Sequence, residues 1–458
     1  MKKNKYEIDM CNGTIMDKLI SFSLPLMVSG ILQLMFNAVD IIVVGRFSGS
    51  QALAAVGSTT ALINVFINLF MGISLGANVL AARYYAAGRD REMSETVHTS
   101  IMLALISGVV MAFVGVFFAK GALELMDTPA DVIDQSALYM RIYFMGMPFF
   151  MLYNYGAAIL RAVGDTKRPL YFLMAAGVMN VLGVINAGLN MFLVIVFSLD
   201  VAGVAIATVV SQAISCVLVL RCLYKSEGSY QLRFSKLCLK KDYIIPIFQV
   251  GIPAGIQSTV INFSNVLLQS SVNSFGSIAM AGYTAANNVL GFLYTSVNSV
   301  TQACMSFTSQ NYGVGKYKRM DKVLIDCLIL SSGMALVMGG GAYLFGTEIL
   351  QIYTGDPEVI RCGMEILSIT TVPYFLCGIM DLFPGALRGM GCSAVPMILS
   401  VIGTVGTRIV WIFGIFPQHR SLYVLFISYP GSWIITIILQ VICYLIVRKK
   451  VHSRAAAV

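Results

Sequence analysis

Three polar side chains inside the first long apolar run are the first candidates for ion chemistry. Gln33, Asn37 and Asp40 occur at i, i+4 and i+7, which places two carboxamides and one carboxylate on one stripe of a helix. The run from Ile20 to Gly45 is long enough to cross a hydrocarbon layer of roughly 30 Å. A charge at the centre of such a helix costs roughly 2.5 kcal/mol or more, so acids there usually face a cavity or polar partner and take part in transport. Asp40 is therefore a candidate for binding a proton or a sodium ion; the alternative is an acid that only bonds neighbouring helices.

The composition is that of a membrane protein. Of the 458 residues, 57% are hydrophobic and 12% are charged, and the mean hydropathy is +0.80, whereas soluble domains carry about 25% charged residues. The formal net charge of +9 would suggest a nucleic-acid partner in a soluble protein. Here Lys and Arg gather in short loops between apolar runs, which is the orientation signal of membrane proteins, so we expect no nucleic-acid partner. The polar first residues and the long apolar run after them argue against a cleaved signal peptide.

Twelve apolar runs are long enough to span a bilayer as helices. We expect them at 17–45, 53–83, 97–118, 133–158, 170–196, 202–224, 244–274, 279–311, 322–345, 359–386, 396–416 and 422–447. Basic residues concentrate at the two termini and in every second loop. Both termini are therefore predicted to be cytoplasmic.

The two halves of the sequence repeat. AARYYAAGRDREM aligns with TSQNYGVGKYKRM, and LRAVGDTKRP aligns with LRGMGCSAVP. Gly88 pairs with Gly315 and Arg161 with Arg388, in both cases 227 positions apart. One offset shared by separate segments indicates an internal duplication. Because each half has an even number of spans, the two repeats enter the membrane in the same sense.

The predicted fold is an all-α integral membrane protein with twelve transmembrane helices in two six-helix bundles related by a parallel repeat. The first bundle is expected at 1–224 and the second at 243–458, joined by a basic cytoplasmic linker at 225–242. The linker charges either set the orientation of the chain or bind anionic lipid at the membrane surface.

Several motifs occur in the order and spacing of one transporter family: VDIIVVGRFSGSQALAAVG after the first acid, the loops AAGRD and GVGKYKR, both LRxxG loops, and VAGVAIATVVSQ. Together they resemble the multidrug and toxic compound extrusion (MATE) family of cation-coupled exporters, over nearly the whole chain. In bacterial and archaeal relatives, polar residues of helices 1, 4, 5 and 6 form a site in the N-terminal bundle. The resemblance implies that the ion-coupling residues here are Asp40, Asn154, Asn186, Asn190 and Thr208. Asn190 departs from the family pattern, because many relatives have a carboxylate there, so only Asp40 is expected to titrate in this bundle.

A second candidate lies in the C-terminal half. Asp381 is the repeat partner of Asn154, and a branch of the family uses an acid there together with a Glu in helix 7. Here helix 7 contains no acid, so a coupling role and a gating or structural role both stay open for Asp381. Helix 7 instead carries a carboxamide stripe. It either lines a substrate path together with Gln33 and Asn37 or binds helix 8; its candidate lining residues are Asn262, Asn265 and Gln269.

The predicted function is secondary antiport: export of organic, cationic amphiphilic compounds in exchange for H+ or Na+, across the plasma membrane of a bacterium. We expect a monomer that contacts membrane lipid, has no cofactor other than the coupling ion, has no metal site and is not an enzyme. A lipid-linked saccharide flippase of the wider superfamily is an alternative, but it would need several cations inside the first-half spans, where Arg141 is the clear candidate. An intramembrane enzyme is the alternative of another class. The sequence has no HExxH or CxxC pair and no GxxxxGK[ST] loop for an ATP-driven pump.

Overall fold

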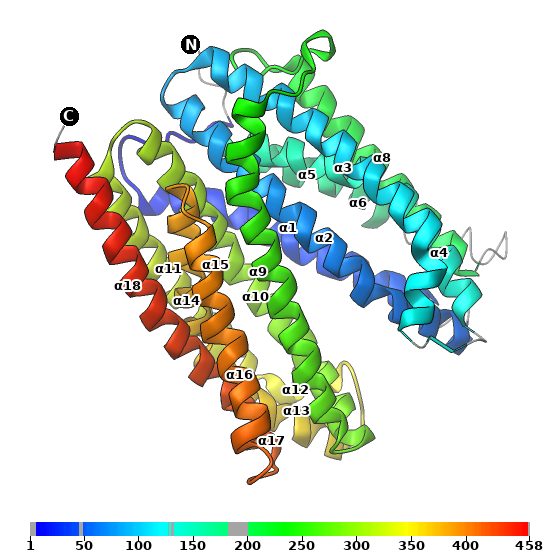
Figure 1. Ribbon diagram of the computed structural model, residues 1–458. Helices are drawn as coiled ribbons and strands as arrows, with labels where there is room; N and C mark the ends of the chain where they lie inside the picture. Colours follow the sequence, from blue (N-terminus) through cyan, green and yellow to red (C-terminus); the bar gives the residue numbers. More distant parts are fainter. Residues whose placement is uncertain (1–5, 45–48, 127, 130–131, 182–199, 457–458) are drawn as a thin grey trace. The chain divides into compact units, whose positions relative to one another are not determined.

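The computed structural model describes residues 6–44, 49–126, 128–129, 132–181 and 200–456. Every regular element in these ranges is a helix (Figure 1). This is the expected result for long apolar runs, because a chain in hydrocarbon must satisfy its backbone N–H and C=O groups within itself.

The first half of the chain contains seven described α-helices and one short 3₁₀ turn. They are α1 (Met16–Val43), α2 (Gly49–Ala86), α3 (Asp90–Leu125), α4 (Ile133–Met145), α5 (Met147–Ala162), α6 (Lys167–Val181), α8 (Asp200–Lys225) and η3 (Phe234–Lys236). The second half follows with α9 (Lys241–Asn273), α10 (Ser277–Gly313), α11 (Tyr317–Leu344), α12 (Gly346–Gln351), α13 (Pro357–Thr370), α14 (Tyr374–Gly389), α15 (Ala394–Ser400), η4 (Val401–Gly406), α16 (Thr407–Val410), η5 (Trp411–Ile415), α17 (Leu422–Phe426) and α18 (Ser428–Ala456).

Each predicted span coincides with one of these helices or with a consecutive group of them. Eight described helical stretches are long and apolar enough to cross a membrane, and the bent pair α13 and α14 makes a ninth when it is counted as one span. The other three predicted spans fall on α4 with α5, on α6, and on α10. The predicted span at 170–196 continues beyond α6 into residues outside the described ranges.

Proline marks the two broken spans. Pro148 lies in the first turn of α5, directly after the break at Gly146, and Pro373 immediately precedes α14, which is bent from α13 by 51°. Proline has no N–H to donate and its ring clashes with the preceding turn, so a helix bends or restarts there. The span from α15 to η5 is irregular in another way, since the π-helical segments η4 and η5 flank the single α-turn of α16.

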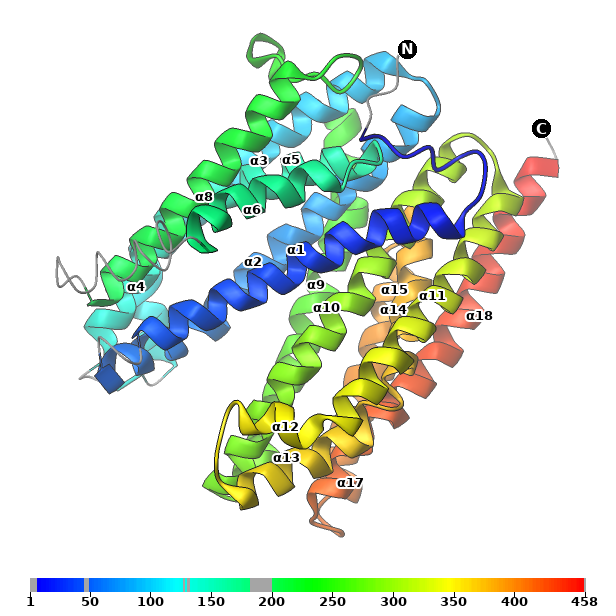
Figure 2. The ribbon, with the colours of Figure 1, turned by 180° about the vertical axis from the view of Figure 1, so that it is seen from behind.

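Contacts divide the chain into two compact units. The first comprises Met1–Ile8 and Leu32–Gly255, and the second comprises Asp9–Ile31 and Ile256–Val458. Two helices are therefore shared: α1 begins in the second unit and ends in the first, and α9 begins in the first and ends in the second. In the first unit α3, α5, α6 and α8 run alongside one another (Figures 1 and 2).

A glycine seam joins α2 to the first half of α9 within the first unit. A Cβ on Gly72 would lie 2.3 Å from the Gly255 backbone nitrogen, one on Gly76 would lie 2.1 Å from the Ile247 carbonyl oxygen, and one on Gly251 would lie 2.4 Å from the Ile73 Cα. Both helices thus carry a G-x-x-x-G pattern on their contacting faces, which allows the two backbones to touch.

The linker before α9 contacts the first turns of α3. Glu95 accepts hydrogen bonds from the Tyr243 hydroxyl at 2.6 Å and pairs with Lys240 Nζ at 2.7 Å. His98 Nε2 accepts from the Arg233 backbone N–H at 3.0 Å. The linker thus has specific protein partners, while Arg233 and Lys236 keep exposed side chains.

The chain before α1 is docked in the second unit by an arginine. Arg319, at the start of α11, donates to the carbonyl oxygens of Met10, Asn12 and Gly13 at 2.9 to 3.2 Å. Lys316 donates to the Cys11 carbonyl at 3.0 Å. This segment is held mainly through its own backbone oxygens.

Candidate functional site

The centre of the candidate site is the contact between Asp40 on α1 and Thr208 on α8. The Thr208 hydroxyl lies 3.2 Å from Asp40 Oδ2 and 3.0 Å from the Val204 carbonyl oxygen one turn earlier. A threonine has one O–H proton and an oxygen that also accepts. Thr208 can therefore donate to an ionised Asp40, or donate to Val204 and accept from a protonated Asp40. The arrangement suits the carboxyl in both charge states.

Two tyrosines of α4 lie within the electrostatic reach of this carboxylate. The Asp40 charge acts on the hydroxyls of Tyr139 and Tyr143, whose ring centroids are 6.0 Å apart. Sequence reasoning missed both, because a tyrosine counts as part of an apolar run. The available signal was their i, i+4 spacing, which places two hydroxyls on one face of a helix.

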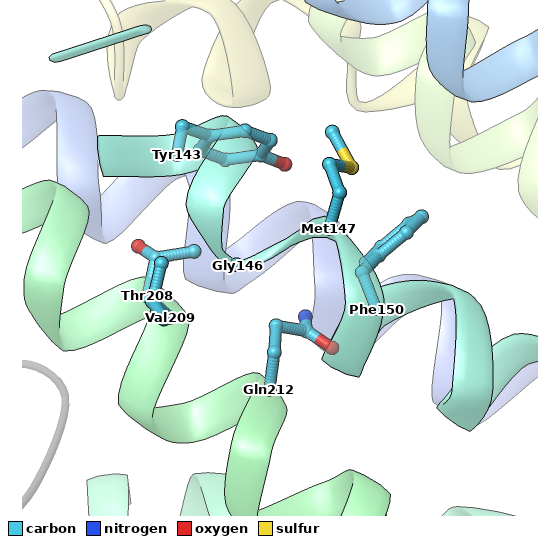
Figure 3. A pocket seen from close by; sticks show the side chains of 7 residues that line it. All are labelled: Tyr143, Gly146, Met147, Phe150, Thr208, Val209 and Gln212. Atoms are coloured by element: carbon cyan, nitrogen blue, oxygen red, sulfur yellow. The ribbon is translucent and has the colours of Figure 1, made fainter. Parts of the chain in front are cut away.

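A small cavity of about 10 Å³ lies against Thr208 (Figure 3). Tyr143, Met147 and Phe150 line it from α4 and α5, and Thr208 and Gln212 face them from α8. The break between α4 and α5 comes close to α8, since a Cβ on Gly146 would lie 2.5 Å from the Val209 side chain. The Gln212 Oε1 atom is buried and has no hydrogen-bond partner among the described residues. A space of this size holds about one water molecule, which could bond Gln212 and Thr208 together.

The other predicted coupling residues are placed differently. Asn154 is buried on α5, and its Nδ2 donates to the Phe150 carbonyl of its own helix at 2.8 Å. Asn186 and Asn190 lie outside the described residues. Gln33 and Asn37 are exposed on α1, two turns and one turn, respectively, before the half-buried Asp40.

Asp381 on α14 lies near a guanidinium. Its charge interacts with that of Arg388, two turns later on the same helix, and with the Tyr294 hydroxyl on α10. Arg388 also donates to Gln257 Oε1 at 2.7 Å. Arg388 thus acts on the half-buried Asp381 carboxylate through its charge, while its hydrogen bond goes to Gln257.

The carboxamide stripe of α9 has one member committed to a buried cation. Asn265 Oδ1 accepts from Arg408 Nη1 at 2.8 Å, and the Arg408 guanidinium lies 4.2 Å from the centroid of the Tyr429 ring. Arg408 is 3% exposed. Asn265 thus contacts a buried cation within the second unit, whereas Asn262 and Gln269 are exposed.

Comparison with known proteins places this fold and site in a family. A family model described as MatE matches residues 25–185 and 253–413. The Bacillus subtilis protein named "Probable multidrug resistance protein YoeA" is 30% identical over 94% of this chain and 93% of its own length. The chain belongs to the MatE family. A second relative, the Staphylococcus aureus "Multidrug export protein MepA", is 22% identical over 84% of each chain.

Solved structures support the same conclusion for the fold. A MATE crystal structure in complex with MaL6 superposes with a TM-score of 0.91 at 18% identity, over 98% of this chain and 100% of that one. An outward-facing multidrug resistance MATE transporter gives 0.87 at 19% identity, over 100% of both chains. The predicted two-repeat, twelve-helix MATE fold is confirmed, and the two ranges matched by the family model begin at 25 and 253, close to the offset of the internal repeat. The protein is a multi-pass membrane transporter of the MATE type.

Proposed function

We propose that this transporter exports organic, cationic amphiphilic compounds in exchange for H+ or Na+, with Asp40 as the coupling carboxylate. The membrane would be the plasma membrane of a bacterium, with both termini cytoplasmic. Support for the cargo comes from the names of the relatives, which are multidrug resistance and multidrug export proteins.

The observation that carries the coupling role is the Asp40–Thr208 contact. Coupling requires a group that exists in two charge states inside the membrane, and Thr208 offers a hydrogen bond to each of them. A proton or sodium ion on Asp40 cancels the charge that attracts an organic cation. Ion and cargo then exclude one another, which is the requirement for exchange.

Asp381 is assigned a structural role in this proposal. Arg388 lies two turns later on the same helix, and its fixed positive charge would oppose a cation arriving at Asp381.

The test is efflux of a fluorescent organic cation from proteoliposomes under a proton gradient and, separately, a sodium gradient. Asp40→Asn should abolish gradient-driven efflux, whereas Asp381→Asn should reduce it only in proportion to any loss of folded protein. Asp134→Asn is the control, since this acid has an 81% exposed side chain paired with Lys120. The gradient that drives wild-type efflux identifies the ion. If only Asp381→Asn loses gradient-driven efflux, the proposal has placed coupling in the wrong unit. If the wild type moves no organic cation under either gradient, the proposed cargo is wrong.

A further inference from the structure

A groove of about 340 Å³ lies at one end of the second unit, away from the C-terminus. It runs between the last turns of α9 and the end of η5 with the loop that follows. Figure 1 shows α17 at this end of the unit and the C-terminus of α18 at the other. We call it the Ser–Arg groove, after Ser270, Ser271, Ser274 and Arg420, which line it together with Ile412, Phe413, Phe416 and Pro417.

The lining of the Ser–Arg groove is divided by chemistry. The α9 wall presents three serine hydroxyls, and the opposite wall is aromatic and aliphatic. Phe413 is 71% exposed, so most of its ring is open to whatever surrounds the helix. A site with a polar wall, an apolar wall and a position at the end of a membrane span suits an amphiphile at the bilayer interface.

Arg420 gives the groove its charge. Its Nη2 donates to Ser274 Oγ at 3.3 Å, and its guanidinium lies 6.0 Å from the centroid of the Phe416 ring. An arginine has five N–H donors, and the planar fork matches the oxygens of a phosphate. None of the described residues that line the groove is an acid, so the Arg420 charge attracts an anion and opposes a cationic head group.

We propose that the Ser–Arg groove binds an anionic phospholipid, with its phosphate on Arg420 and the serine hydroxyls and an acyl chain along Phe413. The planar guanidinium of an arginine at a membrane interface suits the oxygens of a lipid phosphate. The exported cargo proposed above is cationic and would be repelled by Arg420, so this site is separate in chemistry from the one at Asp40. A soluble phosphate would use the same polar wall but leave Phe413 unused.

The experiment measures binding of phosphatidylglycerol to the purified full chain in neutral detergent by native mass spectrometry. Phosphatidylcholine and soluble glycerol 3-phosphate are the comparison ligands. Wild type should retain phosphatidylglycerol in preference to both. Arg420→Gln should weaken that binding roughly tenfold, which corresponds to loss of charge-assisted hydrogen bonds to a phosphate. Phe413→Ala should weaken binding of the long-chain lipid and leave binding of glycerol 3-phosphate unchanged.

The control is Arg361→Gln, an exposed arginine of α13 that pairs with Glu358 outside the groove. An equal loss of lipid in Arg361→Gln would overturn the proposal in favour of general surface charge. Equal binding of glycerol 3-phosphate by wild type would overturn the lipid assignment in favour of a soluble phosphate. Ser270→Leu provides a second variant that keeps Arg420: it should exclude the lipid by filling the groove, and retention of lipid in this variant would contradict the assignment.

Discussion

The Thr208 hydroxyl has one proton and two acceptors within reach, Asp40 and the Val204 carbonyl. Thr208→Val keeps the shape of the side chain but removes both the donor and the acceptor. Because hydrogen bonds to charged groups contribute about 1.5–3 kcal/mol, we expect gradient-driven efflux to fall roughly tenfold or more. Thr208→Ser should restore it to within about a factor of two. If Thr208→Val transports at the wild-type rate, the hydroxyl does not take part in coupling.

The buried Arg408 allows a second prediction at the scale of single residues, about protein stability. Asn265→Leu would leave the Arg408 guanidinium without its carboxamide partner at 2.8 Å. We expect the free energy of unfolding to fall by about 1–3 kcal/mol, measured by thermal or denaturant unfolding in detergent. Asn262→Leu, one turn earlier and exposed, should change it by less than about 0.5 kcal/mol. Similar losses in the two variants would show that α9 is sensitive to any apolar substitution on this stripe.

Only part of the candidate site could be predicted from the sequence. A carboxylate inside an apolar run is conspicuous, so Asp40 was found, and the family resemblance supplied Thr208. The tyrosines of α4 and Gln212 were missed, because their role depends on which helix faces lie together and not on their chemical type. Asn265 also accepts a hydrogen bond from Arg408, 143 positions later in the chain, and no local pattern reveals such a pairing.

At the scale of helices, the glycine seam between α2 and α9 allows a prediction about stability, with a second glycine of α2 as the control. Gly76→Ala would place a methyl group 2.1 Å from the Ile247 carbonyl, so the helices must separate. We expect a loss of about 1–3 kcal/mol or more in the free energy of unfolding. Gly57 is on the same helix with nothing within 4 Å of its Cβ position. Gly57→Ala should therefore stabilise the protein by about 0.5–1 kcal/mol, and thermal unfolding in detergent compares the two.

The docked linker makes a second prediction at this scale. Glu95→Gln removes the charge that holds Lys240 and weakens the bond from Tyr243. Opening of the linker should become about fivefold to tenfold more frequent, because about 1 kcal/mol of local stabilisation is lost. Limited trypsin cleavage after Lys236 measures this opening. Glu92→Gln is the matched control, since Glu92 pairs with Arg89 at 2.6 Å and has no role in the linker contact. Equal cleavage rates in the two variants would contradict the docking.

The boundaries of the helices were the easier part of the prediction. Apolar runs fixed the described spans to within several residues, and prolines marked the breaks before α5 and α14. The π-helical segments around α16 were not predicted, because they depend on packing against neighbouring helices and carry no proline.

At the scale of the whole chain, the repeat extends to the segments before α1 and α9. Residues 10–13 and 237–240 correspond at the offset of 227. The first segment contacts the beginning of α11 and the second contacts the beginning of α3, and each of these helices follows one of the two repeated glycine loops. The repeated loops before α3 and α11 could be predicted from the sequence, because their glycines align at this offset. The docking at Arg319 could not be predicted, because the acceptors there are backbone oxygens, which every residue possesses.

The helices shared between the two units bear on whether the gene can be divided. A cut between Gly228 and Ser229 separates the repeats, yet fragment 1–228 would lack Lys241–Gly255, the stretch of α9 that belongs to its own unit, and fragment 229–458 would lack Asp9–Ile31. We expect each fragment expressed alone to be degraded or aggregated, and co-expressed fragments to assemble and restore efflux, as measured by membrane abundance and dye export. A stable, monodisperse fragment 1–228 would contradict this. The expected result would instead mean that each repeat is incomplete without the other, so that dividing the gene cannot yield a functional half-length transporter.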